Sequence, residues 1–332
     1  MDPRIAGKKI LITGGAGFIG SHLADYCLAH GAALVTVMDN LSTGYRQNIS
    51  ELESNPAFEF LQMDIRDYDA CEKATKNKDI VLHNAALGSV PRSIQDPFST
   101  HAVNVDGFFN VLHASYKNNV RHFIYASSSS VYGDNDDIPK LEEKTGKPLS
   151  PYALTKSINE RYAEIFYQCY NYPSIGLRYF NVFGPRQDPQ GPYAAVIPRF
   201  IQWCLEGKPL QIYGDGTIER DFTYVYNVVE ANLKAIEKGL EKGLRIYNVG
   251  CGYATTIKAL AEKILKLYSE IEGQQSRSVI QYCPPRPGDI KRSTASIDRI
   301  SQELGFTPSV LIDEGLRETM LWFMKKNAVT KL

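Results

Sequence analysis

The sequence lacks the features that mark several classes of protein. None of its apolar runs approaches the roughly 18–20 residues needed to span a bilayer. The N-terminal stretch MDPRIAGKKILITGG leads directly into a strand-like run, without the layout of a signal peptide. Lysine plus arginine and aspartate plus glutamate each number 37, so the formal net charge is zero, and no basic run indicates a nucleic acid or a membrane surface as a partner. We therefore expect a cytoplasmic protein that binds neither.

Cysteine is scarce and scattered. The six cysteines form no CxxC pair and show no cysteine–histidine spacing typical of a metal site. We interpret them as reduced core thiols of a cytoplasmic protein and predict no metal site.

The overall composition is ordinary for a globular protein, with 43% hydrophobic and 22% charged residues. Because 332 residues exceed what one core usually organises, the length favours a large domain with a smaller second one.

The first half of the chain alternates short apolar runs with helical patterns. Helices are expected from about Ile19 to His30 and from about Phe98 to Asn118. The runs KKILITGG, ALVTVMDN, FEFLQMDI, DIVLHNAA and HFIYASSSS are rich in the apolar residues typical of parallel strands covered on both faces. PSIGLRYFNVFG adds a further strand. This alternation predicts an α/β fold with a Rossmann-type, doubly wound parallel sheet.

After about Gly184 the pattern is less regular. RQDPQGPYAA predicts a loop, and LQIYG and RIYNVG predict short strands. Helices are expected over about Thr255–Glu270 and Asp313–Lys325. We therefore divide the chain into a Rossmann domain, residues 1–184, and a smaller mixed α/β substrate domain, residues 185–332. Segments near 222–250 are expected to return to the first sheet.

A glycine-rich turn follows the first predicted strand. In ILITGGAGFIGSHL, Gly14, Gly17 and Gly20 have the spacing G-x-x-G-x-x-G between a strand and a helix. Glycine lets backbone N–H groups approach a pyrophosphate, whose charge the helix N-terminus stabilises. Asp39 ends the second strand, where a carboxylate binds both adenosine ribose hydroxyls and repels a 2′-phosphate, although turn and cap residues also occur there. These residues predict NAD rather than NADP as the cofactor. Asp64, after the third strand, is either an adenine contact or an ordinary loop aspartate.

Tyr152 and Lys156, in SPYALTKSINERYAEIF (150–166), stand four residues apart and therefore share a helix face. A free tyrosine with a pKa near ~10 is a poor base, but a nearby ammonium favours the phenolate, and NAD⁺ bound beside it adds positive charge in the same direction. Such a tyrosine can take a proton from a substrate hydroxyl while a hydride leaves the same carbon for nicotinamide. The spacing alone is also that of a solvated helix face. The dinucleotide turn upstream favours the catalytic interpretation.

The strand end YASSSSVYGD (125–134) places four serines at the carboxyl edge of a parallel strand, where ligands bind in open α/β sheets. One hydroxyl there could hydrogen bond the reacting oxygen and relay its proton to Tyr152. A hydroxyl-rich turn that caps its own backbone explains some of these serines but hardly the whole run.

Taken together, the motifs TGGAGFIG, HNAA, SSSSVYG, Y-x-x-x-K and LRYFNVFGPR resemble the extended short-chain dehydrogenase/reductases that act on nucleotide sugars. The resemblance runs from Lys8 to about Phe323. Within that family the chain is most similar to UDP-hexose 4-epimerases. The stretches GSVPRSIQDP (88–97) and YFNVFGPRQDPQGPYAAVIP (179–198) resemble the UDP-N-acetylglucosamine 4-epimerases of bacterial surface-polysaccharide pathways. The resemblance also implies a homodimer, formed through the long helix before the fifth strand and the Tyr152/Lys156 helix.

The resemblance implies roles for individual residues. Ser128, identified by its distance from Tyr132 and Gly133, would be catalytic together with Tyr152 and Lys156. The residues implied to bind NAD are Gly14, Gly17, Phe18, Ile19, Gly20, Asp39, Asn40, Asp64, Ile65, Ala85, Ala86, Asn104, Tyr152, Lys156 and Tyr179. The residues implied to bind the UDP-sugar are Ser89, Ser128, Ser129, Ser130, Asn181, Ala195, Val196, Gln211, Tyr213, Arg220, Arg286, Asp289 and Ser293. An arginine pair suits a diphosphate, because guanidinium groups bind its oxygens bidentately.

Two departures from relatives that act on non-acetylated sugars bear on the substrate. Such relatives carry a lysine shortly after the HNAA segment, where this chain has Gly88 and Ser89. They often place a tyrosine four residues after Asp289, where this chain has Ser293. A small residue there leaves room for an N-acetyl group. The resemblance thus implies interconversion of UDP-GlcNAc and UDP-GalNAc, and also of UDP-glucose and UDP-galactose, through a transient 4-keto sugar.

Other activities on the same fold stay open. UDP-glucuronate 4-epimerisation needs only a different sugar pocket. A 4,6-dehydratase or a decarboxylase needs an additional acid or base near the serines, and here the first carboxylate after them is Asp134. A non-catalytic NAD-binding regulator is the alternative from another class, because a fold does not imply a function. The joint presence of Ser128, Tyr152 and Lys156 counts against it.

Overall fold

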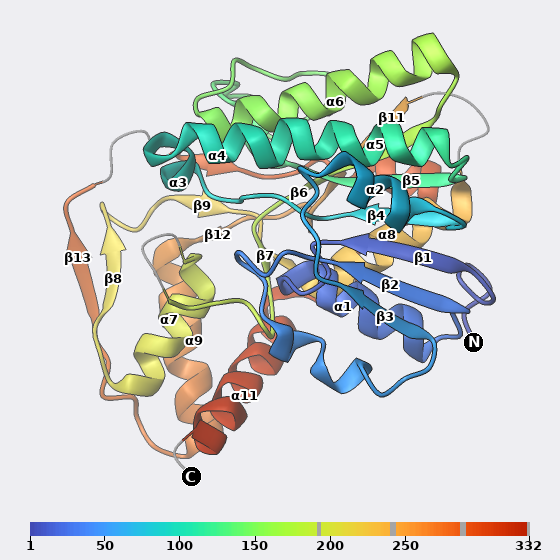
Figure 1. Cartoon of the computed structure of the whole chain (residues 1–332). Coiled ribbons are helices and arrows are strands. Elements are labelled where there is room, and N and C mark those ends of the chain that lie inside the picture. The colour runs from blue at the N-terminus through green and yellow to red at the C-terminus, as the bar shows by residue number, and fades with distance from the viewer. Residues whose placement is uncertain (191–193, 240–243, 286–289, 331–332) are drawn as a thin grey trace.

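A seven-stranded parallel sheet forms the centre of the molecule, which confirms the predicted Rossmann-type α/β fold (Figure 1). The computed structural model describes residues 1–190, 194–239, 244–285 and 290–330. The strand order is β3-β2-β1-β4-β5-β6-β11, so the chain winds outward from β1 in both directions. This order creates a topological switch point between β1 and β4, beside the carboxyl ends of the strands. The strands are β1 (Lys9–Thr13), β2 (Leu34–Met38), β3 (Phe58–Leu61), β4 (Ile80–His83), β5 (His122–Ser128), β6 (Ser174–Tyr179) and β11 (Leu244–Val249).

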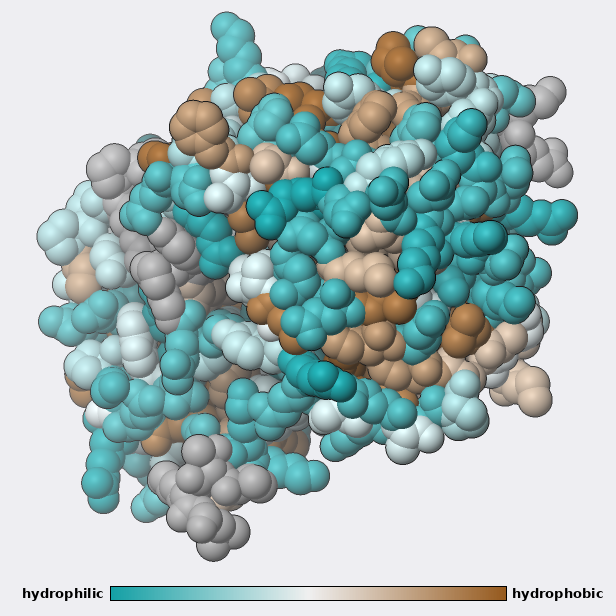
Figure 2. All heavy atoms as spheres, viewed as in Figure 1, coloured by the Kyte–Doolittle hydropathy of each residue, from teal (hydrophilic) through white to brown (hydrophobic). Residues whose placement is uncertain are grey.

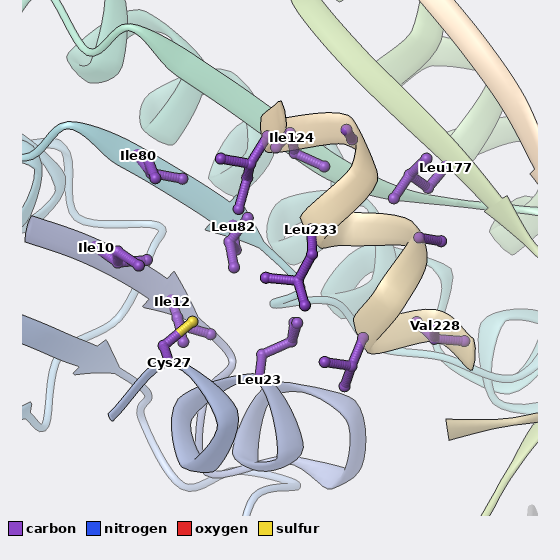
Figure 3. Packing of buried hydrophobic residues seen from close by; sticks show 14 of the residues in the cluster. Ile10, Ile12, Leu23, Cys27, Ile80, Leu82, Ile124, Leu177, Val228 and Leu233 are labelled. Carbon is purple, nitrogen blue, oxygen red and sulfur yellow. The ribbon is translucent and has the colours of Figure 1, made fainter. Parts of the chain in front are cut away.

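Helices cover both faces of this sheet because alternate strand residues point to opposite sides. Ile10 and Ile12 of β1 pack with Leu23 of α1 (Phe18–Ala29) and with residues of α8 (Val225–Lys238), as Figure 3 shows. Leu11, between them, belongs to the core on the opposite face. The elements on and around that face are α2 (Tyr68–Thr75), α3 (Val90–Gln95), α4 (Pro97–His101), the π-helical turn η3 (Ala102–Gly107), α5 (Phe108–Lys117) and α6 (Pro151–Tyr170). Short 3₁₀ helices are η1 (Arg46–Asn48), η2 (Ser50–Leu52) and η4 (Ser129–Tyr132).

The start of α6 is fixed by its own sequence. The Ser150 hydroxyl caps the helix by accepting a hydrogen bond from the Ala153 amide at 3.1 Å, and Pro151 occupies the first helical position, where no N–H is needed. The helix ends at Asn171, which adopts the left-handed conformation with φ of +51°. This cap places Tyr152 in the first turn of the helix.

A second, smaller hydrophobic core lies in the C-terminal half of the chain. It is built from residues such as Phe200, Ile201, Leu260 and Met320, which come from three helices, and from Ile212 on β8. The helices that build this core are α7 (Val196–Glu206), α9 (Ile257–Glu272) and α11 (Ile312–Thr330), and the same half also contains α8 and α10 (Asp298–Leu304). Its strands form short ladders, β10 with β7, β13 with β8, and β9 between β12 and β14. They span β7 (Val182–Phe183), β8 (Leu210–Tyr213), β9 (Glu219–Arg220), β10 (Thr223–Tyr224), β12 (Thr255–Thr256), β13 (Ile280–Cys283) and β14 (Arg292–Ser293).

Parts of the second half pack on the first sheet. Strand β11 pairs in parallel with β6, and α8 packs on the same face as α1. The sequence analysis did not foresee that α10 joins them. Ile300, Leu304 and Phe306 are buried in the same core as Val249 of β11. In the part of the chain that the structure describes, no helix is long and apolar enough to cross a membrane.

Candidate active site

A cavity of about 440 Å³ lies at the carboxyl ends of the central strands. It is lined by the glycine-rich turn after β1, the segments after β2, β3 and β4, the end of β5, and the first turns of α6. Fourteen of the fifteen residues implied to bind NAD line it, all except Asn104. Ser128 lines it as well. The fold therefore brings the candidate cofactor and catalytic residues to one place.

The glycine-rich turn is shaped so that side chains are excluded from it. Gly14 has φ of +67°, and a Cβ there would lie 2.7 Å from the backbone of Ala85. A Cβ on Gly20 would lie 2.3 Å from the Gly14 carbonyl oxygen, so only glycine lets α1 start this close to the turn. Gly17 is the N-terminal cap of α1. The N-terminus of α1 therefore faces the cavity with no side chain between them, which is the arrangement that binds a pyrophosphate.

Asp39 is held at the end of β2 by two backbone amides. Its Oδ1 accepts a hydrogen bond from the Leu41 N–H at 2.8 Å, and its Oδ2 accepts one from the Ala16 N–H at 3.0 Å. Burial nevertheless raises the pKa of this carboxyl group above its usual value. Because a carboxylate offers about four acceptor positions, Asp39 keeps capacity for the two hydroxyls of a ribose.

The carboxylate of Asp64 is already engaged. It accepts a hydrogen bond from Asn40 Nδ2 at 2.8 Å and forms an ion pair with Arg66 at 2.7 Å. The Arg66 guanidinium lowers the pKa of Asp64 to about 2. Asp64 and Asn40 thus form one hydrogen-bonded edge of the cavity.

Asn104 differs from the expectation, because it lies beneath the cavity wall rather than on it. Its Oδ1 accepts a hydrogen bond from the Leu87 amide at 2.8 Å, and its Nδ2 donates to the Leu87 carbonyl and to Thr155 Oγ1. The side chain therefore fixes the segment after β4, which lines the cavity, to helix α6.

Ser128, Tyr152 and Lys156 converge at the end of β5. The Lys156 ammonium donates a hydrogen bond to the Ala126 carbonyl oxygen at 2.7 Å. Ser128 Oγ accepts hydrogen bonds from the amide and the hydroxyl of Ser130, at 3.1 and 2.9 Å. Burial lowers the pKa of Lys156 to about 8, against the opposing effect of Glu160.

The sequence analysis predicted that Lys156 lowers the pKa of Tyr152, and this prediction is wrong for the protein without its cofactor. Burial raises the pKa of Tyr152 above its ordinary value, and only a hydrogen bond with Ser128 opposes that rise. The sequence analysis expected the Lys156 ammonium to lower it, but this ammonium is bonded to the Ala126 carbonyl. The phenolate form therefore requires additional positive charge in the cavity.

A buried ion pair that the sequence analysis did not predict supports helix α6, which carries Tyr152 and Lys156. Glu160 accepts hydrogen bonds from Arg178 Nε and Nη2, both at 2.8 Å, and from Ser127 Oγ at 2.6 Å. Arg178 also donates to Tyr132 Oη and to the Glu142 carbonyl oxygen. The available signal was the position of Glu160, one helical turn after Lys156 and on the same face.

A second missed group lies under the segment after β4. His83 is fully buried and shares a hydrogen bond of 2.8 Å with Thr13 Oγ1. Burial lowers the pKa of His83 to about 3, so the ring is neutral. Thr13 Oγ1 also accepts the Ala85 N–H at 3.4 Å, which ties this segment to β1.

Among the described residues implied to bind the UDP-sugar, Ser128 alone lines the cavity. Asn181, Arg220 and Ser293 lie together, because Ser293 stands opposite Arg220 in the β14–β9 ladder and Asn181 Nδ2 donates to the Asp221 carbonyl oxygen at 3.0 Å. Arg286 and Asp289 lie outside the described residues.

The other residues of that set are distributed over several elements. Ser89 caps α3, with its hydroxyl accepting the Arg92 N–H at 3.3 Å. Gln211 and Tyr213 lie on β8, and Ala195 and Val196 stand at the start of α7. Ser129 and Ser130 form the first turn of η4. Their contact with a substrate stays a prediction.

The family is shown by comparison with known proteins. Residues 10–250 match the NAD dependent epimerase/dehydratase family. A putative UDP-glucose 4-epimerase from Methanocaldococcus jannaschii is 37% identical over 96% of this chain and 99% of its own length. The UDP-N-acetylglucosamine 4-epimerase from Methanobrevibacter ruminantium M1, solved in complex with UDP-N-acetylmuramic acid, is 39% identical over 97% of this chain and all of its own, with a TM-score of 0.89. The UDP-glucose 4-epimerase of Thermus thermophilus, solved in complex with NAD, is 36% identical over 95% of this chain and 99% of its own, with a TM-score of 0.83. The chain belongs to the NAD dependent epimerase/dehydratase family, as the motifs predicted, and NAD is its cofactor.

Proposed function

We propose that this protein is a 4-epimerase that interconverts UDP-N-acetylglucosamine and UDP-N-acetylgalactosamine. The observation that carries the proposal is the convergence of Ser128, Tyr152 and Lys156 on the cofactor cavity, whose lining carboxylates among the described residues are Asp39 and Asp64, after β2 and β3. Glu160 accepts a hydrogen bond from Ser127, but it is paired with Arg178 and does not line the cavity. Asp134, the first carboxylate after the serines in the chain, accepts the Lys147 N–H at 2.7 Å in its own loop. Dehydration and decarboxylation of the sugar need a further acid or base, so the site supports chemistry at one carbon only.

The mechanism follows from the residues around the cavity. Bound NAD supplies the acceptor and donor of a hydride at C4 of the sugar. Tyr152 removes the proton of the 4-hydroxyl group and later returns it, with Ser128 bonding the same oxygen. While it is protonated, Lys156 supplies one positive charge near the phenol. The other contribution of the protein is to hold the UDP group firmly and the hexose loosely, so that the 4-keto sugar can present its opposite face.

The preference for an acetylated sugar rests on Ser293. Its position opposite Arg220 puts a short side chain next to a residue that we expect to bind the diphosphate. A tyrosine at this position would occupy the volume that an N-acetyl group needs. We therefore expect UDP-GlcNAc and UDP-GalNAc to be accepted, with UDP-glucose and UDP-galactose as smaller substrates.

We also propose that two copies of the chain associate through α5 and α6. Apolar side chains stand exposed on this side of the molecule, with Phe98 of α4 88% exposed and Ile165 of α6 47% exposed. Phe109 of α5 and Tyr162 of α6 pack edge to face beside them. Figure 2 shows brown, apolar surface among the polar residues at the top of the view, where these helices lie. Ile165→Glu should convert the dimer to a monomer in light scattering, and a wild-type protein that is already monomeric would contradict the proposal.

The reaction is tested with purified protein and no added NAD. UDP-GlcNAc should be converted to UDP-GalNAc, and Tyr152→Phe should lower the rate at least about a hundredfold, as the loss of a general acid–base group does. Ser293→Tyr should remove activity on the acetylated pair and keep activity on UDP-glucose. A wild type without turnover that behaves like Tyr152→Phe would refute the assignment as an enzyme. Turnover of UDP-glucuronate instead would move the assignment to the uronic-acid epimerases.

A further inference from the structure

Asp221 is a fully buried carboxylate between β9 and β10. Its Oδ1 accepts a hydrogen bond from the Cys251 N–H at 2.8 Å. Its Oδ2 accepts the Gly252 N–H at 3.0 Å and the Ala295 N–H at 3.2 Å. One side chain thus satisfies three backbone amides from two segments that lie about 30 and 74 residues away in the chain.

The backbone N–H and carbonyl groups of Asp221 are hydrogen-bonded as well. Its N–H donates to the Ser293 carbonyl oxygen at 2.9 Å, and its own carbonyl oxygen accepts the hydrogen bond from Asn181 Nδ2 at 3.0 Å. Arg220 precedes it directly. The residues that we expect to bind the UDP-sugar from three elements, Asn181, Arg220 and Ser293, are therefore all connected to this one residue.

The packing leaves little freedom around the carboxylate. A Cβ on Gly250 would lie 2.8 Å from Asp221 Oδ2 and 2.7 Å from the Ala295 side chain. Among the described residues, the hydrogen-bond donors that the carboxylate meets are backbone amides, so the dipoles of these amides stabilise its charge. A buried charge held in this way carries a desolvation cost that an apolar residue would avoid. Because this cost is not needed for packing, we infer that the Asp221 carboxylate serves the neighbouring residues that we expect to bind the UDP-sugar.

We propose that Asp221 is a positioning residue that fixes Asn181, Arg220 and Ser293 relative to one another, so that they bind the UDP-sugar as a unit. The inference rests on the proposed function, in that these three residues are taken to contact the substrate. Among the residues that the structure describes, Asp221 hydrogen bonds to backbone groups and to the Asn181 side chain, so it acts through its neighbours. Its loss should weaken substrate binding while leaving the cofactor cavity, which is built on the other sheet, unchanged.

The role requires the ionised form. Both carboxylate oxygens accept N–H groups, and a proton on either oxygen turns an acceptor into a donor that faces another donor. Burial raises the pKa of Asp221 to about 6, so this change occurs just below neutral pH. The titratable groups that face it are the Cys251 thiol and the Tyr253 phenol, whose pKa values are both raised, so they stay neutral. Arg220, the neighbouring residue in the chain, carries a guanidinium group, which does not deprotonate in proteins.

The same reasoning makes Asp221→Asn an informative variant. It conserves shape, but in either orientation its NH₂ group meets at least one backbone N–H, so it mimics the protonated side chain at every pH. Glu142→Gln is the matched control. Glu142 is also a buried carboxylate that accepts a backbone N–H, from Asn248 at 3.0 Å, and it has no bond to the three substrate-side residues.

The experiment measures Kd by calorimetry and KM for UDP-GlcNAc, together with kcat and the NAD content of the purified holoenzyme, from pH 5 to 8. UDP-GlcNAc is suitable because its diphosphate diester has no proton that titrates in this range. For Asp221→Asn we expect Kd and KM to rise on the order of tenfold at pH 7.5, the effect of about one lost hydrogen bond to a charged group. NAD content should stay unchanged, and Glu142→Gln should keep the wild-type KM. Wild-type Kd should rise as pH falls through about 6, and that of Asp221→Asn should be flat.

Either of two results would overturn the proposal. One is a wild-type Kd that does not change between pH 5 and 8, which needs no variant and is therefore independent of whether Asp221→Asn folds. The other is an equal loss of binding and NAD content in Asp221→Asn and Glu142→Gln, which would indicate a general structural role. Failure of the proposed function is distinguishable from both, because then the wild type binds a UDP-sugar with the predicted pH dependence but does not epimerise it. If UDP-GlcNAc does not bind, the same titration is made with UDP-glucose.

Discussion

Replacing Glu160 by glutamine should strongly destabilise the protein, because it breaks a buried ion pair on one side only. The Glu160 and Arg178 side chains are 9% and 3% exposed, and they are joined by two parallel hydrogen bonds of 2.8 Å. Removing one partner of such a pair leaves an uncompensated buried charge and costs about 3–5 kcal/mol. That is a large share of the roughly 5–15 kcal/mol that stabilises a typical domain. The bonds of Arg178 to Tyr132 and to the Glu142 carbonyl persist in the variant, but both acceptors are neutral.

The same variant should change the chemistry of Lys156. Glu160 raises the pKa of Lys156, which burial lowers to about 8. Without the carboxylate, this pKa falls further, and Arg178 on β6 stays nearby without its counter-ion. The other titratable groups around Lys156 are Tyr152 on the same helix and His83 on β4, which is neutral. The alkaline limb of the activity profile should therefore move to lower pH.

A double-mutant cycle separates these effects. Urea unfolding of the wild type, Glu160→Gln, Arg178→Met and the double variant gives the coupling free energy of the pair. We expect each single variant to lose about 3–5 kcal/mol and the double variant to lose clearly less than their sum, because it buries no unpaired charge. Additive losses, with a coupling below about 1 kcal/mol, would refute the stability argument. An unmoved pH–rate profile in a folded Glu160→Gln protein would refute the argument about Lys156.

Further predictions concern the glycine-rich turn after β1, Asp221 and Lys156. Gly20→Ala should lower the free energy of unfolding by about 1–3 kcal/mol and reduce the amount of co-purified NAD, because the new Cβ would lie 2.3 Å from the Gly14 carbonyl oxygen. Gly88→Ala is the control, because a Cβ there meets open space, and it should leave the Tm unchanged. The raised pKa of Asp221, about 6 against ~3.9 in the unfolded chain, means that the folded protein binds more protons between these values. Its contribution to the free energy of unfolding should therefore fall by up to about 3 kcal/mol as pH rises from 4 to 6, and comparison with Asp221→Asn in urea at both pH values measures it. The Lys156 amine should titrate near pH 8, so activity should show an inflection there that the residual activity of Lys156→Met lacks.

The sequence places most of the residues that we expect to bind the cofactor around one cavity, because the signals for them are local. The spacing of Gly14, Gly17 and Gly20, and the position of Asp39 at a strand end, are read within about 30 residues of chain, and these residues line the cavity together. The doubly wound parallel sheet was predicted for the same reason, since each strand and helix shows its own pattern, whereas the strand order comes from the structure. Asn104 was expected on the cavity wall. Its hydrogen bonds to Leu87 and Thr155, which hold it beneath that wall, depend on tertiary packing and could not be inferred from the sequence.

The groups that support the site were missed because their partners are distant in the chain. Arg178 meets Glu160 across 18 residues, and Asp221 meets Ala295 across 74. The direction of the Tyr152 pKa shift was wrong for a related reason. Spacing showed a lysine one turn away, but it could show neither the burial of the phenol nor the carbonyl oxygen of Ala126 that holds the ammonium.

The cofactor side and the proposed UDP-sugar side of the site are held by different means, and the difference fits the proposed reaction. The cofactor side rests on a continuous seven-stranded sheet, whereas Arg220 and Ser293 lie on strands of two residues each. A sugar that turns over between two hydride transfers needs a fixed UDP group and free space around the hexose. Asp221 can fix this backbone without filling that space, because the partners of its carboxylate in the described part of the chain are main-chain amides. Asp221→Asn should therefore weaken UDP-GlcNAc and UDP-glucose by the same factor, whereas Ser293→Tyr should separate them. Unequal weakening by Asp221→Asn would mean that this carboxylate shapes the sugar pocket itself.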